Sequence, residues 1–179
     1  MNIKNFILLV GIMLLGQSTF ATPTNDAKDK ITVYIFLHES CLISQFYTLP
    51  LKELHSTFAS KRLQFVGLFP NTSSQPKNIQ KFKEKYQIPF ELKTDHSKFK
   101  VAQFGATVTP EVVVYNETQN QVLYQGRIDN TYARVGKKRQ VTTSAELKDA
   151  LEAITNCETI AVTKTDPVGC FINRNTSLK

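Results

Sequence analysis

Three cysteines are the residues of this chain best suited to redox chemistry, at positions 41, 157 and 170. Cys41 begins the stretch Cys41-Leu42-Ile43-Ser44, so a serine replaces the second cysteine of a Cys-x-x-Cys redox motif. A cysteine reacts as its thiolate, which can attack a disulfide. Ser44 can donate a hydrogen bond to that thiolate, but it cannot release a partner held on Cys41 as a mixed disulfide. The stretch therefore predicts a nucleophile whose resolving thiol lies elsewhere.

Two cysteines near the C-terminus offer alternative partners. Cys170 follows Gly169 in a tail long enough to fold back on the domain, which makes it a candidate resolving thiol for Cys41. Cys170 could instead pair with Cys157 as a structural staple that pins the tail, and a small external thiol could then resolve Cys41. The sequence leaves both pairings open.

The remaining polar candidates are single residues. His38 lies three positions before Cys41 and could stabilise the thiolate, although a polar residue at a strand end more often faces solvent. His38 and Cys41 make only two potential metal ligands, so we expect neither a metal site nor a cofactor. Arg127 and Asp129 fit either an ion pair or turn residues, or a role beside the active site.

The first 21 residues resemble a secretory signal peptide. Lys4 precedes an apolar run over 6–15, and small and polar residues follow up to Ala21. A membrane span needs about 20 apolar residues, so we expect this segment to be removed rather than to anchor the protein. The sequence thus predicts an exported, periplasmic or secreted protein without stable membrane insertion after cleavage.

The predicted mature chain is one domain and a tail. Removing 21 of 179 residues leaves 158, divided into an N-terminal segment 22–30, a domain 31–155 and a tail 156–179. The net charge falls from +7 to +6, because the removed segment carries one lysine and no acid. Basic residues are scattered, and the short cluster Lys137-Lys138-Arg139 is more typical of a solvated face than of a nucleic-acid site. No internal repeat is present, and the oligomeric state stays undetermined.

Hydrophobic patterns predict alternating strands and helices. The run at 31–37 is apolar enough for a strand buried on both faces, and the helix that follows over 43–59 contains Pro50, which should bend it. Further strands are expected at 63–69, 88–95, 111–116 and 121–129, and further helices at 76–86, 97–105 and 143–154. Thr143 and Glu146 have the spacing of a capping box. The order predicts an α/β fold, with a mixed sheet, helices on both faces and a C-terminal antiparallel hairpin.

Several of these segments resemble a known family. "FLHESC" at a strand-to-helix turn, the helix containing Pro50, and "GATVTPEVVVYN" before a hairpin resemble a thioredoxin-like domain of the exported AhpC/TSA redoxin group. "LYQGRIDNTYARVGKKR" and the late "GCFI" resemble one exported redoxin-like branch of it. Ser44 departs from the thioredoxin pattern, as does Leu42, where a proline often follows the first cysteine.

The resemblance implies roles for particular residues. Cys41 is expected at the N-terminus of the kinked helix, where unpaired N–H groups and the helix dipole lower a thiol pKa. Thr109-Pro110 is expected to be a cis peptide packed against the active-site turn, and Ser44 and Cys170 complete the expected site.

Three functions fit this pattern. The first is thiol-disulfide exchange at Cys41 with exported protein disulfides or small thiols. The second is a peroxiredoxin-like peroxidase, with antioxidant function, in which peroxide oxidises Cys41 to sulfenic acid. That family requires a threonine or serine three residues before the nucleophile and a proline seven before it, whereas this chain has His38 and Tyr34. The third is a non-enzymatic thioredoxin-like binding module or metal carrier.

Overall fold

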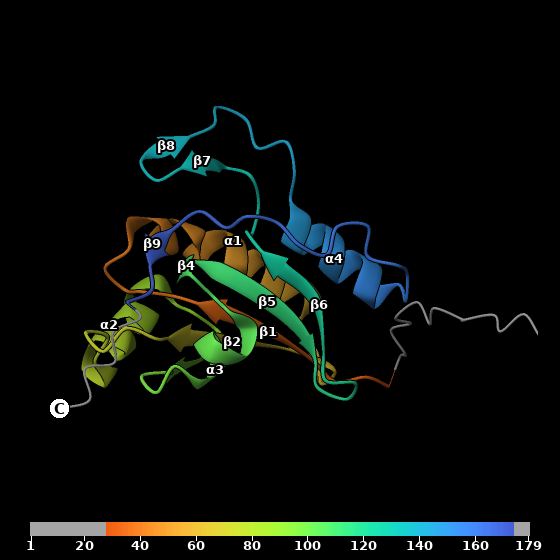
Figure 1. The fold of residues 1–179 in the computed structure, drawn as a ribbon, viewed down its shortest axis with the longest axis horizontal. Coiled ribbons are helices and arrows are strands. Elements are labelled where there is room, and N and C mark those ends of the chain that lie inside the picture. The colour runs from red at the N-terminus through yellow and green to blue at the C-terminus, as the bar shows by residue number, and fades with distance from the viewer. Residues whose placement is uncertain (1–27, 174–179) are drawn as a thin grey trace, which may run out of the picture.

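A mixed five-stranded sheet forms the centre of the computed structural model, which describes residues 28–173 (Figure 1). The strand order is β3-β2-β1-β5-β6, with β1 parallel to β2 and antiparallel to β5. The strands are β1 (Ile31–Phe36), β2 (Leu63–Phe69), β3 (Glu91–Thr94), β5 (Glu111–Asn116) and β6 (Gln121–Gly126). The predicted α/β class, mixed sheet and C-terminal hairpin of β5 and β6 are confirmed. The predicted signal peptide lies outside the described residues.

Helices cover both faces of the sheet, as predicted. They are α1 (Leu42–Phe58), α2 (Pro76–Tyr86), α3 (Phe99–Phe104) and α4 (Glu146–Thr155). One buried cluster joins alternate β1 residues with apolar side chains of α1, α2 and α4, and a second cluster joins the opposite sheet face with α3. Pro50 lies inside α1. Within residues 28–173, none of the helices has the length and apolar character needed to cross a membrane.

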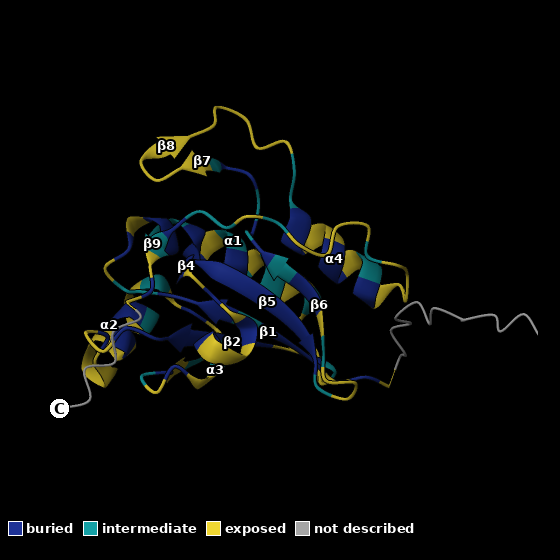
Figure 2. Cartoon of the chain, viewed as in Figure 1, coloured by how far each residue is buried: buried dark blue, intermediate teal, exposed yellow. Residues whose placement is uncertain are grey.

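The centre of the sheet is buried on both faces, which explains its composition. Every residue of β5 is buried, and β1 has one residue, Tyr34, of intermediate exposure (Figure 2). A strand flanked by paired neighbours and covered on both sides has few polar positions, so the runs at 31–36 and 111–116 are almost uninterrupted apolar sequence. Cys41 follows this rigid strand after a short loop.

Four short strands were not predicted. β4 (Val108–Thr109) pairs antiparallel with β9 (Cys170–Phe171), so the end of the tail lies against the segment that precedes β5. β7 (Tyr132–Arg134) and β8 (Lys137–Lys138) form a small hairpin that stands out from the body near α1 (Figure 1). Strands of two or three residues are too short to show a hydrophobic period, so sequence patterns do not reveal them.

Several predicted boundaries are wrong by two or three residues, and at two of them tertiary contacts replace the local interactions. No capping box forms: α4 begins at Glu146, whose carboxylate pairs with Arg127, while the Thr143 hydroxyl accepts a hydrogen bond from Asn130. The strand predicted to reach residue 129 ends at Gly126, where φ is 147° and the backbone of Thr165 leaves no room for a side chain. The tail crosses the end of β6 there.

Candidate thiol site

Cys41 occupies the N-cap position of α1, as the resemblance implied. Its φ and ψ are −80° and 117°, and its carbonyl accepts the first helical hydrogen bond, from the Gln45 N–H at 2.9 Å. The Cys41 N–H donates to the carbonyl of His38 at 3.0 Å, which closes the turn after β1. The sulfur atom therefore lies beside the free N–H groups of the first helical turn, a position that favours negative charge.

Hydrogen bonds to the Cys41 sulfur decide its protonation. The side chain is buried, with 2% of its surface exposed, and burial alone raises a thiol pKa. Donors on Cys170 and Ser44, both side chains and backbone N–H groups, outweigh burial and hold the pKa of Cys41 below its ordinary value. In its protonated form Cys41 donates to the Thr109 carbonyl at 3.2 Å. Ser44, which is fully buried, also accepts a bond from the His38 N–H.

Cys170 lies within hydrogen-bonding reach of Cys41, although 129 positions separate the two residues in the sequence. Burial and the neighbouring Cys41 sulfur raise the pKa of Cys170 to about 12. At neutral pH Cys170 is therefore a protonated donor, and Cys41 is the thiol of the pair that ionises more easily. Cys157 is exposed at the end of α4, and no disulfide joins any of the three cysteines, all of which lie within residues 28–173.

The segment that carries Cys170, residues 166–173, is called the strap below. Thr109 Oγ1 donates to the Cys170 carbonyl at 3.3 Å, and the Ile172 N–H donates to the Thr107 carbonyl at 2.9 Å. Ile172 is buried in the α3 cluster. At Gly169, a side chain would overlap the Thr109 carbonyl, so only glycine allows this close approach. The sequence Gly169-Cys170 thus brings the second thiol against β4.

The Thr109-Pro110 peptide is cis, as the resemblance implied, and Thr109 is fully buried. Glu111, the first residue of β5, was not predicted to matter here. Its buried carboxylate accepts hydrogen bonds from the Thr107 N–H and the Gln125 amide, both at 2.8 Å. These bonds hold the loop before Pro110 in place. An acid directly ahead of the apolar run Val112–Tyr115 was the sequence signal that could have revealed it.

The histidines take structural positions. The His38 ring hydrogen-bonds to the hydroxyl of Ser73 at 3.2 Å, and nothing in the described part of the chain places that ring on Cys41. His55 packs edge-on against Phe65, and burial lowers its pKa. His96 contacts the Ser74 carbonyl at 3.0 Å. Across residues 28–173, no three His, Cys, Asp or Glu side chains gather in a way that could hold a metal ion.

Arg127 and Asp129 each join two elements of the fold. Arg127 forms an ion pair with Glu146 at the start of α4, and burial of Glu146 is outweighed by this contact, so the pKa of Glu146 is lowered. Asp129 accepts a 2.5 Å hydrogen bond from the hydroxyl of Tyr47 on α1. Arg127 therefore forms an ion pair with Glu146 and not with Asp129, the partner that the sequence suggested.

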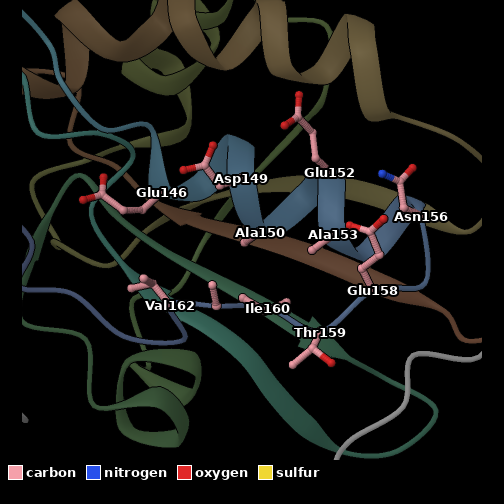
Figure 3. A pocket seen from close by; sticks show the side chains of 11 residues that line it. Glu146, Asp149, Ala150, Glu152, Ala153, Asn156, Glu158, Thr159, Ile160 and Val162 are labelled. Atoms are coloured by element: carbon pink, nitrogen blue, oxygen red, sulfur yellow. The ribbon is translucent and has the colours of Figure 1, made fainter.

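A pocket of about 320 Å³ lies between α4 and the start of the tail (Figure 3). Ile160 and Val162 lie across from Ala150 and Ala153 of α4, and acidic side chains surround them. None of the cysteines lines this pocket. Another cavity, of about 460 Å³, lies on the sheet face beside α3 and also lacks a cysteine. Cys41 itself is buried, with Cys170 of the strap beside its sulfur atom.

Comparisons with known proteins concern the fold. No protein-family model and no curated protein matches the chain. An uncharacterized conserved protein from Geobacillus kaustophilus matches with a TM-score of 0.72 and 21% identity, over 83% of this chain and 79% of its own. A hypothetical protein from Sinorhizobium meliloti matches with a TM-score of 0.70 and 21% identity, over 82% and 80%. The MTB protein dsbF, solved in mixed oxidized and reduced forms, matches with a TM-score of 0.50 and 20% identity, over 70% and 81%.

The fold is thioredoxin-like. The sheet order, the helix that begins at Cys41 and the cis-proline ahead of β5 agree with this description. At about 20% identity the likeness concerns the fold alone, so the activity has to be inferred from the arrangement of the two thiols.

Proposed function

We propose that this protein is an exported thiol-disulfide oxidoreductase in which Cys41 is the nucleophile and Cys170 the resolving thiol. The observation that carries the proposal is the contact between the two thiols, whose pKa values are displaced in opposite directions. Neighbouring titratable groups with separated pKa values are suited to different chemical roles. The fold shared with dsbF, which is known in oxidized and reduced forms, supports the same class of reaction.

The reaction needs two exchange steps. The Cys41 thiolate attacks one sulfur of a partner disulfide, the partner S–S bond breaks, and the second partner sulfur leaves as a thiolate that takes up a proton. Cys170 then loses its proton and attacks the Cys41 sulfur, which releases the other partner thiol. The partner disulfide gains two electrons, and the Cys41–Cys170 pair loses two. An external dithiol restores the reduced pair by the same steps in reverse.

Access to Cys41 requires the strap to withdraw. With 2% of its surface exposed, Cys41 cannot meet a protein disulfide while Cys170 covers it. The strap is held by the two-residue pairing of β4 with β9, by Ile172, by packing of Val168 on the core and by the Asn173 N–H, which donates to Asn71 at 2.9 Å. These contacts are confined to a short segment that can open locally. Ser44 remains beside the sulfur as a donor when Cys170 leaves.

Assignment to the AhpC/TSA redoxin group and a periplasmic or secreted location belong to the same proposal. They rest on the sequence resemblance and on residues 1–21. An exported protein meets an oxidising compartment, in which protein disulfides are abundant partners.

The test compares the wild type with Cys41→Ser, Cys170→Ser and Cys157→Ser. We expect the reduced wild type and Cys157→Ser to cleave a model disulfide and to yield a Cys41–Cys170 peptide on non-reducing mass spectrometry. Cys170→Ser should accumulate the mixed disulfide at Cys41, and Cys41→Ser should be inert. Equal activity of Cys41→Ser and the wild type would refute the proposal.

The alternatives predict other results in the same samples. Stoichiometric sulfenic acid at Cys41 under low peroxide, without disulfide cleavage, would indicate a peroxidase. A Cys41 that stays unreactive in the folded protein would indicate a binding module. A Cys157–Cys170 disulfide with free Cys41 would remove Cys170 from the mechanism.

A further inference from the structure

The hairpin of β7 and β8 carries a concentrated positive charge that the proposed exchange at the two thiols does not use. Residues 131–143 contain four cationic side chains and no acid. All four are exposed: Arg134, Lys137, Lys138 and Arg139. The name basic hairpin is used below for residues 131–143. The nearest acid in sequence, Asp129, is already engaged with Tyr47 and with the Thr131 N–H.

The basic hairpin is held in place at its base. The amide of Asn130 donates to the Thr143 hydroxyl at 2.7 Å, and the Thr143 N–H donates back to Asn130 at 2.9 Å. Within the hairpin, the Arg139 N–H donates to the Thr131 carbonyl at 2.7 Å. These bonds join the two ends of the basic hairpin, so its cationic side chains project from a defined position.

Aromatic contacts place the basic hairpin over the part of α1 that begins at Cys41. The Tyr132 ring packs edge-on against Phe46 at 5.4 Å, and the ammonium group of Lys138 lies 3.5 Å from the centre of the Phe46 ring. Phe46 is one helical turn from Leu42, the residue after Cys41. Figure 1 shows β7 and β8 standing above α1, toward the end of the helix near which β9 lies.

A large exposed apolar side chain follows each of the two thiols. Leu42, directly after Cys41, is 76% exposed, and Phe171, directly after Cys170, is 85% exposed. Large exposed apolar side chains beside a charged patch are typical of a surface that contacts a polypeptide. A small thiol or a peroxide would need neither the apolar side chains nor the charges.

We propose that the physiological partner of this site is an acidic polypeptide, whose carboxylates lie along the basic hairpin while its disulfide reaches Cys41 between Leu42 and Phe171. This proposal rests on the proposed function, because lipids and nucleic acids lack the disulfide that Cys41 attacks. The positive charges steer the partner to the thiols and accelerate association. The chemistry is the exchange described above: the partner disulfide is reduced, and Cys41 and Cys170 are oxidised.

The experiment measures the rate at which the reduced protein cleaves two peptides. Each has one intramolecular disulfide and the same core, flanked by glutamates in one and by lysines in the other. Wild type should cleave the acidic peptide about tenfold faster at about 10 mM salt, where the Debye length is about 30 Å, and the preference should vanish near 1 M salt.

Two triple variants separate the basic hairpin from net charge. R134E/K137E/R139E reverses three hairpin charges and keeps Lys138, which packs on Phe46. The control K61E/K81E/K85E reverses three exposed lysines outside the hairpin. We expect the hairpin variant to prefer the lysine peptide and the control to keep most of the wild-type preference. Circular dichroism verifies that both variants fold.

Equal rates for the two peptides, or equal effects of both triple variants, would overturn the proposal, as would hairpin-dependent binding to anionic vesicles without a peptide preference. Uncharged hydroxyethyl disulfide tests the proposed function separately. If its cleavage does not depend on Cys41, the exchange function fails; if it does and no charge preference exists, only the acidic partner fails.

Discussion

At the scale of single residues, the two neighbouring thiols differ in which groups surround each sulfur atom. Cys41 receives hydrogen bonds from Ser44 and Cys170, whereas Cys170 faces the developing negative charge of Cys41. The same sulfur–sulfur contact therefore lowers one pKa and raises the other. Ser44 stands where a Cys-x-x-Cys motif has its second cysteine. Its hydroxyl can donate a hydrogen bond to the Cys41 sulfur but cannot form a disulfide with it.

Replacement of Cys170 tests which group lowers the pKa of Cys41. Cys170→Ala removes a side-chain donor, so the Cys41 thiolate loses stabilisation and its pKa should rise. Cys170→Ser keeps a donor and should leave the Cys41 pKa closer to that of the wild type. The thiolate absorbance, followed against pH in a Cys157→Ser background, gives the midpoint of Cys41 ionisation in each variant. Identical midpoints for the alanine and serine variants would show that the Cys170 side chain contributes nothing.

At the scale of elements, short contacts between distant segments position the site. β4 and β9 have two residues each, yet their pairing brings Cys170 onto Cys41. Arg127, after β6, joins Glu146 at the start of α4 and takes the place of a local helix cap. Both junctions depend on particular residues, which makes them accessible to single substitutions.

Gly169→Ala tests the junction of β4 and β9. Its Cβ would overlap the backbone carbonyl of Thr109, which cannot yield as a flexible side chain could, so the strap should detach. We expect Cys41 to react about tenfold faster with a bulky maleimide, as expected when local opening costs about 1.4 kcal/mol less. Gly105→Asn is the control, because nothing lies within 4 Å of a Cβ there. Unchanged maleimide kinetics in Gly169→Ala would contradict the expected crowding.

Arg127→Ala tests the junction with α4. The variant leaves the buried Glu146 carboxylate without its cation, so we expect the free energy of unfolding at pH 7 to fall by about 2 kcal/mol. The folded-state pKa of Glu146 is depressed, so its stabilisation is present above the ordinary carboxyl pKa of about 4.3 and is lost as the pH falls through the folded value.

Urea denaturation at several pH values measures that difference. The difference in the free energy of unfolding between wild type and Arg127→Ala should therefore become smaller below about pH 4. Arg134→Ala, which removes an exposed arginine of the basic hairpin, should cost little at any pH. If this difference in unfolding free energy does not change with pH, Arg127 stabilises the fold through packing and not through its contact with Glu146.

At the scale of the whole molecule, the chain closes its own reactive site. The tail crosses the end of β6 at Thr165, whose hydroxyl accepts from the Arg127 N–H at 3.0 Å, and then continues as the strap to Ile172. The strap covers one thiol with the other, while the basic hairpin stands beside them. The proposed reaction thus couples chemistry to the position of the strap.

Hydrogen exchange should report that coupling. The proposed mechanism requires the strap of the reduced protein to open transiently and expose Cys41, whereas a Cys41–Cys170 bond would hold the strap in place. We expect the Ile172 N–H, bonded to the Thr107 carbonyl, to exchange about tenfold more slowly after oxidation. Amides inside β1 should not change, and Cys170→Ser should show no redox dependence. Equal Ile172 exchange in both redox states would mean that oxidation does not restrain the strap.

Hydrophobic patterns were enough to predict the central architecture and the position of Cys41 at the start of a helix. The runs at 31–36, 63–69 and 111–116 are apolar because strands buried on both faces allow little else, and helical periodicity marks α1, α2 and α4. Cys41 at the first turn of α1 follows from the order of these elements. The cis state of Thr109-Pro110 came from the family resemblance and not from composition.

Tertiary contacts place Cys170 beside Cys41. The sequence left open whether Cys170 meets Cys41 or pairs with Cys157, because spacing along an irregular tail does not determine which sulfur atoms approach one another. The choice depends on contacts between distant residues: Gly169 against the Thr109 carbonyl, and Thr165 against the end of β6. The capping box failed for the same reason, since Arg127 offered Glu146 a partner that no local pattern records.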